Sequence, residues 1–167
     1  MRQKRTLPRK DAREDVILFT VGGFRFAIAA AAVSEIRSMD GLERFFGGTG
    51  HRAMAKVVYT LERNGVTHFV VSGAQHFHLP PSKATRVLVL RQTTAAVLVD
   101  STDRMVEIAV LHALPLAFHA DERHWYRGLT IVNGDAVPVV NPSAFLSKGE
   151  VAVLRATTQQ MQRVAVG

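Results

Sequence analysis

Seven histidines are the side chains in this 167-residue sequence best suited to holding a metal ion. His76 and His78 would share one face of a strand, and His68 could lie nearby across a hairpin. However, no carboxylate stands at ligand spacing from them, there is no HExxH motif, and no cysteine can supply a thiolate. We therefore predict no metal site and no cofactor, and we expect these histidines to be exposed or to face a partner.

Three further sets of residues could serve catalysis or nucleotide binding, and each also has a simpler structural explanation. Gly47-Gly48-Thr49-Gly50 lacks the Lys-Ser/Thr pair of a phosphate-binding loop, so a connector is expected. Asp100 and Asp103 could form a carboxylate pair, or could cap the segment that follows. Trp125 and Tyr126 could stack on bases, or could anchor the start of a strand in the core. Since a GxSxG motif is also missing, we predict no catalytic residues and no enzymatic activity.

The formal net charge of +7 would suit a nucleic-acid-binding protein, so its position in the chain matters. Residues 1–15 hold six Lys/Arg against three Asp/Glu, which places nearly half of the excess in this short segment. The segment has no apolar stretch typical of a secretory signal. We predict a disordered basic leader, and we keep a nucleic-acid-binding small β-barrel as the alternative function.

Short strands joined by glycine turns are expected to make up most of the remaining chain. Gly22-Gly23 would join strands at 16–21 and 24–28. Asn64-Gly65 and Asn133-Gly134 match the type I′ turns of hairpins, which need two residues with positive φ. The other expected strands span 56–61, 66–72, 86–90, 95–100, 130–133 and 136–140.

Helical spacing of apolar residues occurs in two places. Residues 29–38 place Ala29, Ala32, Val33 and Ile36 on one face, which predicts a short helix. Residues 150–167 could form a C-terminal helix, and 104–108 reads as a short amphipathic segment. The longest apolar run has eight residues, whereas a membrane-spanning helix needs about 20, so we predict no membrane insertion.

The same order of elements occurs twice along the chain. Val33-Ser34-Glu35-Ile36 and Met105-Val106-Glu107-Ile108 each follow a strand pair, and each precedes an Asn-Gly hairpin at nearly the same spacing. The repeat lies in the pattern, with little identity. It predicts a mainly β fold of two similar small units, each closing its edges as a barrel.

The ordered set of segments resembles the CheW-like domain of bacterial chemotaxis signalling. Val33-Ser34-Glu35-Ile36-Arg37 is similar to the family's Val-x-Glu-Ile-Arg segment, and the strand pair of 86–90 and 96–100 ends in the family's Val-Asp. Tyr126-Arg127-Gly128-Leu129 and Val137-Pro138-Val139-Val140-Asn141 resemble its closing strands. The resemblance covers roughly residues 16–147. It departs from the family at Leu61-Glu62-Arg63-Asn64-Gly65, where an Asn-Leu-Arg-Gly turn is usual.

The resemblance implies two five-stranded SH3-like β-barrels packed together, with short helices and a hydrophobic groove between the barrels. It divides the chain into a leader at 1–15, a CheW-like domain of two barrel subdomains at 16–147, and a tail or helix at 148–167. It implies a non-catalytic cytoplasmic adaptor that couples the regulatory domain of a histidine kinase to the cytoplasmic tips of chemoreceptors.

Partner binding is expected at the segment that the family places beside its groove. In a helix, Val33, Ile36 and Arg37 would form one ridge, while Glu35 would point elsewhere and could pair with a basic group on a partner. Arg63, near the family's arginine turn, is a further candidate. The alternative is that Val33 and Ile36 simply cover the first barrel.

Overall fold

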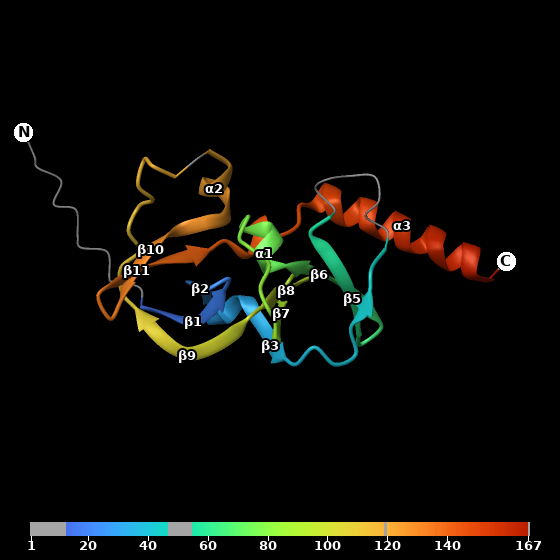
Figure 1. Cartoon of the computed structure of the whole chain (residues 1–167), viewed down its shortest axis with the longest axis horizontal. Coiled ribbons are helices and arrows are strands. Elements are labelled where there is room, and N and C mark those ends of the chain that lie inside the picture. Colours follow the sequence, from blue (N-terminus) through green and yellow to red (C-terminus); the bar gives the residue numbers. More distant parts are fainter. Residues whose placement is uncertain (1–12, 47–54, 119, 167) are drawn as a thin grey trace, which may run out of the picture.

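A computed structural model describes residues 13–46, 55–118 and 120–166, which form eleven strands in two sheets together with short helices and one long one (Figure 1). The strands are β1 (Glu14–Val21), β2 (Phe24–Ala29), β3 (Val33–Arg37), β4 (Glu43–Arg44), β5 (Val57–Arg63), β6 (Val66–Ser72), β7 (Arg86–Leu90), β8 (Ala95–Val99), β9 (Ser101–Ile108), β10 (Tyr126–Val132) and β11 (Asp135–Val140). The helices are η1 (Ala30–Ala32), α1 (Gly73–His76), α2 (Ala120–Trp125), η3 (Pro142–Ala144) and α3 (Lys148–Val166).

The local hairpin signals of the sequence are confirmed. Gly22-Gly23 joins β1 to β2, Asn64-Gly65 joins β5 to β6, and Asn133-Gly134 joins β10 to β11. Both residues of each Asn-Gly pair have positive φ, at 52° and 75° in the first turn and 51° and 84° in the second. These values are typical of type I′ turns, whose twist matches that of the flanking strands.

Each sheet combines strands from both halves of the chain. One sheet has the order β10-β11-β2-β1-β9 and the other β3-β7-β8-β6-β5-β4. In the first, β1 lies antiparallel to β9 and β2 parallel to β11; in the second, β7 lies antiparallel to β3 and β8 parallel to β6. The sequence repeat is therefore present in the topology, but the two repeats exchange their first hairpins instead of forming separate units.

The expected mainly β architecture is confirmed, whereas closed five-stranded barrels are not. The second sheet gains a sixth strand, β4, and over the described residues the hydrogen-bonded strand order of both sheets is open. Both faces of the sheets are nonetheless covered near their centres, because four consecutive residues of β1 in the first sheet and all five residues of β8 in the second are buried. Each sheet thus packs against the other on one face and buries apolar side chains of its own on the opposite face.

Three apolar clusters correspond to this arrangement. The largest lies between the sheets and includes Phe19 and Phe26 from the first, Phe69 and Leu88 from the second, and Leu154 from α3. A smaller cluster belongs to the first sheet alone, with Leu18, Val132 and Val139 among its members. The third belongs to the second sheet, with Leu61, Val70 and Val89. Burial in these clusters is the main source of stability.

The prediction of a helix at 29–38 is wrong. Only Ala30–Ala32 form a single 3-10 turn, and Val33–Arg37 continue as the strand β3. An isolated helix of about ten residues is marginal in water, whereas the strand pairs along its length with β7 and buries Val33. Residues 104–108, expected as an amphipathic segment, likewise belong to a strand, β9.

The first strand and the last helix begin close to the boundaries expected for the leader and the tail. β1 begins at Glu14, inside the predicted leader, where Glu14 pairs with Ile108 of β9, and two ion pairs also join this end to the first sheet. Arg13 pairs with Glu107 at 3.0 Å, and Arg127 pairs with Glu14 at 2.8 Å. Residues 1–12 and 47–54, which include the Gly47–Gly50 segment, lie outside the described residues. At the other end, 148–166 form the helix α3.

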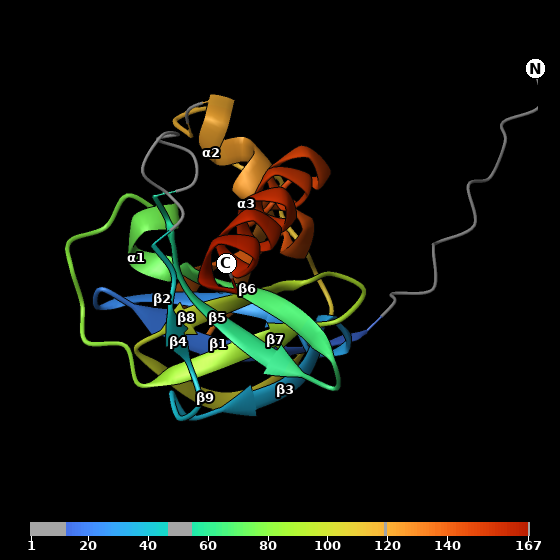
Figure 2. The ribbon, with the colours of Figure 1, turned by 90° about the vertical axis from the view of Figure 1, so that its right-hand side faces the viewer.

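Helices α1, α2 and α3 and two of the four edge strands, β3 and β9, occupy opposite sides of the molecule. In both ribbon views α1, α2 and α3 lie on one side, while β3 and β9, which carry the two Glu-Ile segments, lie on the other (Figures 1 and 2). Both strands are the first or last of their sheets, so each has an unpaired edge. No helix within the described residues is long and apolar enough to cross a membrane.

Candidate partner-binding surface

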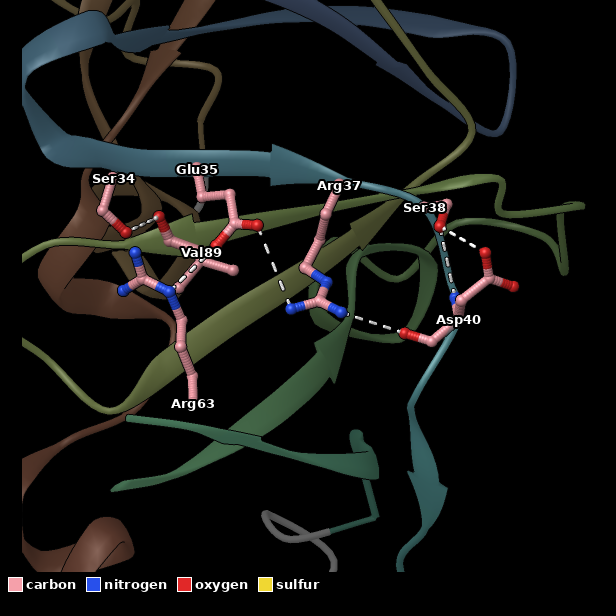
Figure 3. Close-up of polar contacts among 7 residues, drawn as sticks. All are labelled: Ser34, Glu35, Arg37, Ser38, Asp40, Arg63 and Val89. Carbon is pink, nitrogen blue, oxygen red and sulfur yellow. Dashed lines mark hydrogen bonds and ion pairs between the residues drawn. The ribbon is translucent and has the colours of Figure 1, made fainter. Parts of the chain in front are cut away.

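β3 is an edge strand with an irregularity near its start. Its register against β7 shifts between Val33 and Glu35, and the hydroxyl of Ser34 in this shift donates to the carbonyl of Val89 at 3.1 Å (Figure 3). The bulge re-aims the side chains that follow, as β-bulges commonly do. Beyond the bulge, Glu35 and Arg37 lie on one face of the strand and Ile36 on the other.

Glu35 forms an ion pair with a residue that is distant in the sheet. Its Oε2 lies 2.9 Å from Nε of Arg63, at the end of β5 (Figure 3). Three strands separate β3 from β5, so in a flat sheet the two would be roughly 19 Å apart, farther than the two side chains can span. The sheet therefore curls until its first and fifth strands approach one another.

Arg37 completes a cluster of two guanidinium groups around one carboxylate. Its Nη1 lies 4.0 Å from Oε1 of Glu35, and its Nη2 donates to the backbone carbonyl of Asp40 at 3.1 Å (Figure 3). Its Nε is buried without a hydrogen-bond partner. The side chains of Glu35, Arg37 and Arg63 are 38%, 27% and 32% exposed, so the cluster presents a net positive charge to solvent.

The helical ridge expected for this segment does not exist, because the segment is a strand. Val33 is 7% exposed and belongs to the core between the sheets, so for Val33 the core alternative holds. Ile36 is 42% exposed, although it is a large apolar residue. Glu35 already has partners within its own chain. We define the β3 surface as Glu35, Ile36, Arg37 and Arg63.

Residues considered for catalysis or for stacking on bases have structural roles here. The carboxylate of Asp100 accepts hydrogen bonds from the backbone N–H of Gly22 at 2.8 Å and from Ser82 at 2.6 Å, which ties two turns together. Trp125 and Tyr126 are both partly buried: they pack against the core between the sheets and also line a groove on the surface. Burial raises the pKa of Tyr126 to about 12, with a further contribution from Glu122.

The histidines do not form the arrangement expected from a strand. His76 ends the helix α1 and His78 follows that helix with a positive φ of 53°, so the two do not share a strand face. His76 is 4% exposed and His68 is 7% exposed, so neither is a surface residue. Among the described residues, no three His, Asp or Glu side chains are grouped closely enough to hold a metal ion.

Two features were missed by the sequence analysis. One is an aromatic groove of about 570 Å³ on the first sheet, whose lining includes Phe24, Phe26, Phe77, Trp125 and Tyr126. The other is a contact between Lys56, directly before β5, and His76 of helix α1. The alternation of Phe24 and Phe26 in β2 was a signal for the first. The second joins residues 20 positions apart across a hairpin and has no local signal.

Two packed, curled sheets with exchanged hairpins and a charged, partly apolar edge define a small β-rich interaction module. The model of the CheW-like domain family matches residues 15–150, and the chain belongs to this family. CheW-like proteins are non-catalytic adaptors, so the chain is an adaptor or scaffold of chemotaxis-type signal transduction.

A solved structure has the same fold. It is the crystal structure of the scaffolding protein TtCheW from Thermoanaerobacter tengcongensis, which matches with a TM-score of 0.69. The match covers 89% of this chain and 96% of that chain at 11% sequence identity. No match is found among the curated proteins.

Proposed function

We propose that this adaptor couples the regulatory domain of a chemotaxis-type histidine kinase to the cytoplasmic tips of chemoreceptors, and that the β3 surface contacts one of these partners. It would do so without catalysing a reaction, by holding the two proteins at a fixed geometry. Because both partners act in the cytoplasm, we place the adaptor there as well.

The observation that carries this proposal is the ion pair of 2.9 Å between Glu35 and Arg63. It brings together two segments that the family resemblance singled out separately, one on β3 and one at the β5–β6 turn. The assembled patch combines charges of both signs with the exposed side chain of Ile36. Such a mixture of an apolar anchor and polar groups is typical of protein interfaces.

Charge reversal tests the β3 surface. We expect Glu35→Lys and Arg37→Glu each to weaken binding to the kinase regulatory domain or to a receptor fragment by about 2 kcal/mol, roughly thirtyfold in Kd. Folding should be retained, since partly exposed charges contribute roughly 0–1 kcal/mol to stability. The measurement is a calorimetric titration of each variant with each partner. Arg155→Glu, an exposed reversal on α3 across the molecule, is the matched control and should bind normally.

Exchanging the two charges of the Glu35–Arg63 ion pair distinguishes a role in partner binding from a role in stabilising the fold. Glu35→Arg combined with Arg63→Glu restores the ion pair within the chain but reverses its direction. If a partner binds these charged groups, the double variant should regain the folding stability that each single variant loses, while its affinity for the partner should stay low. Recovery of affinity together with stability, or unchanged affinity in all the variants, would move the interface away from the β3 surface.

A further inference from the structure

Lys56 directly precedes the β5–β6 hairpin, and its amine contacts a buried histidine of helix α1. The carbonyl of Lys56 accepts a hydrogen bond from the N–H of Ser72 at 2.7 Å, which fixes its backbone. Its Nζ lies 3.4 Å from Nδ1 of His76. The Lys56 residue as a whole is only partly buried.

Aromatic side chains enclose the histidine that faces this amine. The ring of His76 lies 4.6 Å from Phe145, 4.9 Å from Phe77 and 5.4 Å from Trp125, measured between ring centroids. Burial, with smaller contributions from the neighbouring Lys56 and His78, lowers the pKa of His76 to about 3. The ring is therefore neutral at physiological pH, and its Nδ1 can accept a hydrogen bond from the amine.

The same surroundings act on the lysine. Burial lowers the pKa of the Lys56 amine, and the carboxylate of Glu150 on α3 opposes this effect. Within the described part of the chain, Lys56 forms no direct ion pair with a carboxylate. A partly desolvated lysine of this kind is a better nucleophile at neutral pH than an exposed one, because a larger fraction of its amine is unprotonated.

We propose that Nζ of Lys56 is a covalent modification site that accepts a small acyl group from an activated donor of the acyl phosphate class. The lone pair of the neutral amine attacks the acyl carbon, and a C–N bond forms. The bond between the acyl carbon and the phosphate oxygen breaks, and phosphate leaves with the electron pair. The proton lost by the amine is taken up by the released phosphate, so the product is an amide and no oxidant or reductant is needed.

Acylation would also change how α3 is held. The amide carries no charge, so the attraction between Lys56 and Glu150 in the first turn of α3 would be lost. Lys56 directly precedes β5, whereas Arg63 of the β3 surface is the last residue of that strand. Modification is therefore expected to leave the β3 surface itself intact.

The test compares lysines within one sample of the full chain. The protein is incubated with acetyl phosphate at pH 7.5, and acetylation of each lysine is followed over time by mass spectrometry. We expect Lys56 to react about fivefold faster than Lys83 and Lys148, which are both exposed. At pH 10.5, where about half of the exposed lysine amines are neutral, the exposed lysines should react as fast as Lys56 or faster.

Two variants serve as controls. Glu150→Gln removes the carboxylate that opposes deprotonation and keeps an acceptor for the helix cap, so Lys56 should react faster still at pH 7.5. Lys56→Arg should remove the fast site without changing the rates at Lys83 and Lys148. The proposal is overturned if, in the wild type at pH 7.5, Lys56 reacts no faster than the two exposed lysines.

Discussion

Burial decides the chemistry of His76. The spacing of His76 and His78 suggested a pair on one face of a strand. The chain instead forms a helical turn at this position, and the ring of His76 is enclosed by aromatic side chains. A neutral, buried imidazole next to an amine is a structural element. It has no free face for a metal ion and does not change charge near neutral pH.

His76 should make stability depend on pH in mildly acidic solution. Its folded pKa of about 3 lies below the ordinary value of 6.5, so only the unfolded chain takes up this proton between those values. The free energy of unfolding should therefore fall as pH drops below 6.5, by about 1.4 kcal/mol at pH 5.5. Urea unfolding at pH 7.5 and 5.5 measures this. His76→Phe should remove that part of the pH dependence, and an equal dependence in the variant would refute the assignment.

The residues of the β3 surface show what a sequence can and cannot predict. Glu35, Ile36, Arg37 and Arg63 were singled out from their resemblance to family segments. Their geometry was not predictable, because the Glu35–Arg63 ion pair depends on the curl of a whole sheet. Val33 was assigned to the same surface, yet its side chain belongs to the core, since the bulge at Ser34 separates it from its neighbours.

At the scale of elements, local sequence signals predicted the hairpin turns, whereas the pairing of strands distant in the sequence could not be predicted. Both Asn-Gly hairpins follow from the backbone preferences of two residues, so they could be predicted. The exchange of hairpins between the repeats depends on contacts between distant segments, such as β1 with β9. The helix predicted at 29–38 did not form, although the spacing of its apolar residues suits a helix. The second half of this segment pairs with β7 as a strand instead.

Gly128 tests how tightly β10 is held by the segment before α2. A Cβ at this position would lie 2.4 Å from the carbonyl oxygen of His112 and 2.8 Å from Cγ of Leu111. His112 and Leu129 are joined by backbone hydrogen bonds of 2.7 and 2.9 Å, so the segment cannot yield without losing them. We expect Gly128→Ala to cost at least about 2 kcal/mol in denaturant unfolding.

Gly149 provides the matched control for that substitution. It lies in the first turn of α3, where the nearest atom to an added Cβ is 3.9 Å away. Gly149→Ala should therefore be neutral or stabilise by about 0.5 kcal/mol. If Gly128→Ala were as well tolerated as Gly149→Ala, the close approach of β10 to this segment would be disproved.

At the scale of the whole molecule, stability should not depend on the basic leader. Residues 1–12 offer almost no apolar surface to bury. A deletion of 1–12 also keeps the ion pair between Arg13 and Glu107. We expect thermal unfolding to show nearly the same Tm. A drop of more than about 5 °C, which corresponds to roughly 2 kcal/mol for a domain of this size, would show that the leader packs on the fold.

The positive net charge also has a different meaning once the fold is known. Trp125 and Tyr126, the residues that could have stacked on bases, are partly buried against the core, and they also line the aromatic groove. Several arginines are engaged with carboxylates, including Arg13, Arg63 and Arg127. The family and the fold favour contacts with proteins, and nothing in the described residues adds support for a nucleic-acid-binding function.

The central claim, that this chain couples a chemotaxis-type kinase to its receptors, is tested most directly by capture from the cells that make it. Tagged full-length protein and its Arg37→Glu variant are each used to capture partners from lysate, which are identified by mass spectrometry. We expect the wild type to retain both a histidine kinase and a chemoreceptor, and the variant to lose at least one of them. Retention of neither partner, or of nucleic acid in a salt-sensitive manner instead, would contradict the account.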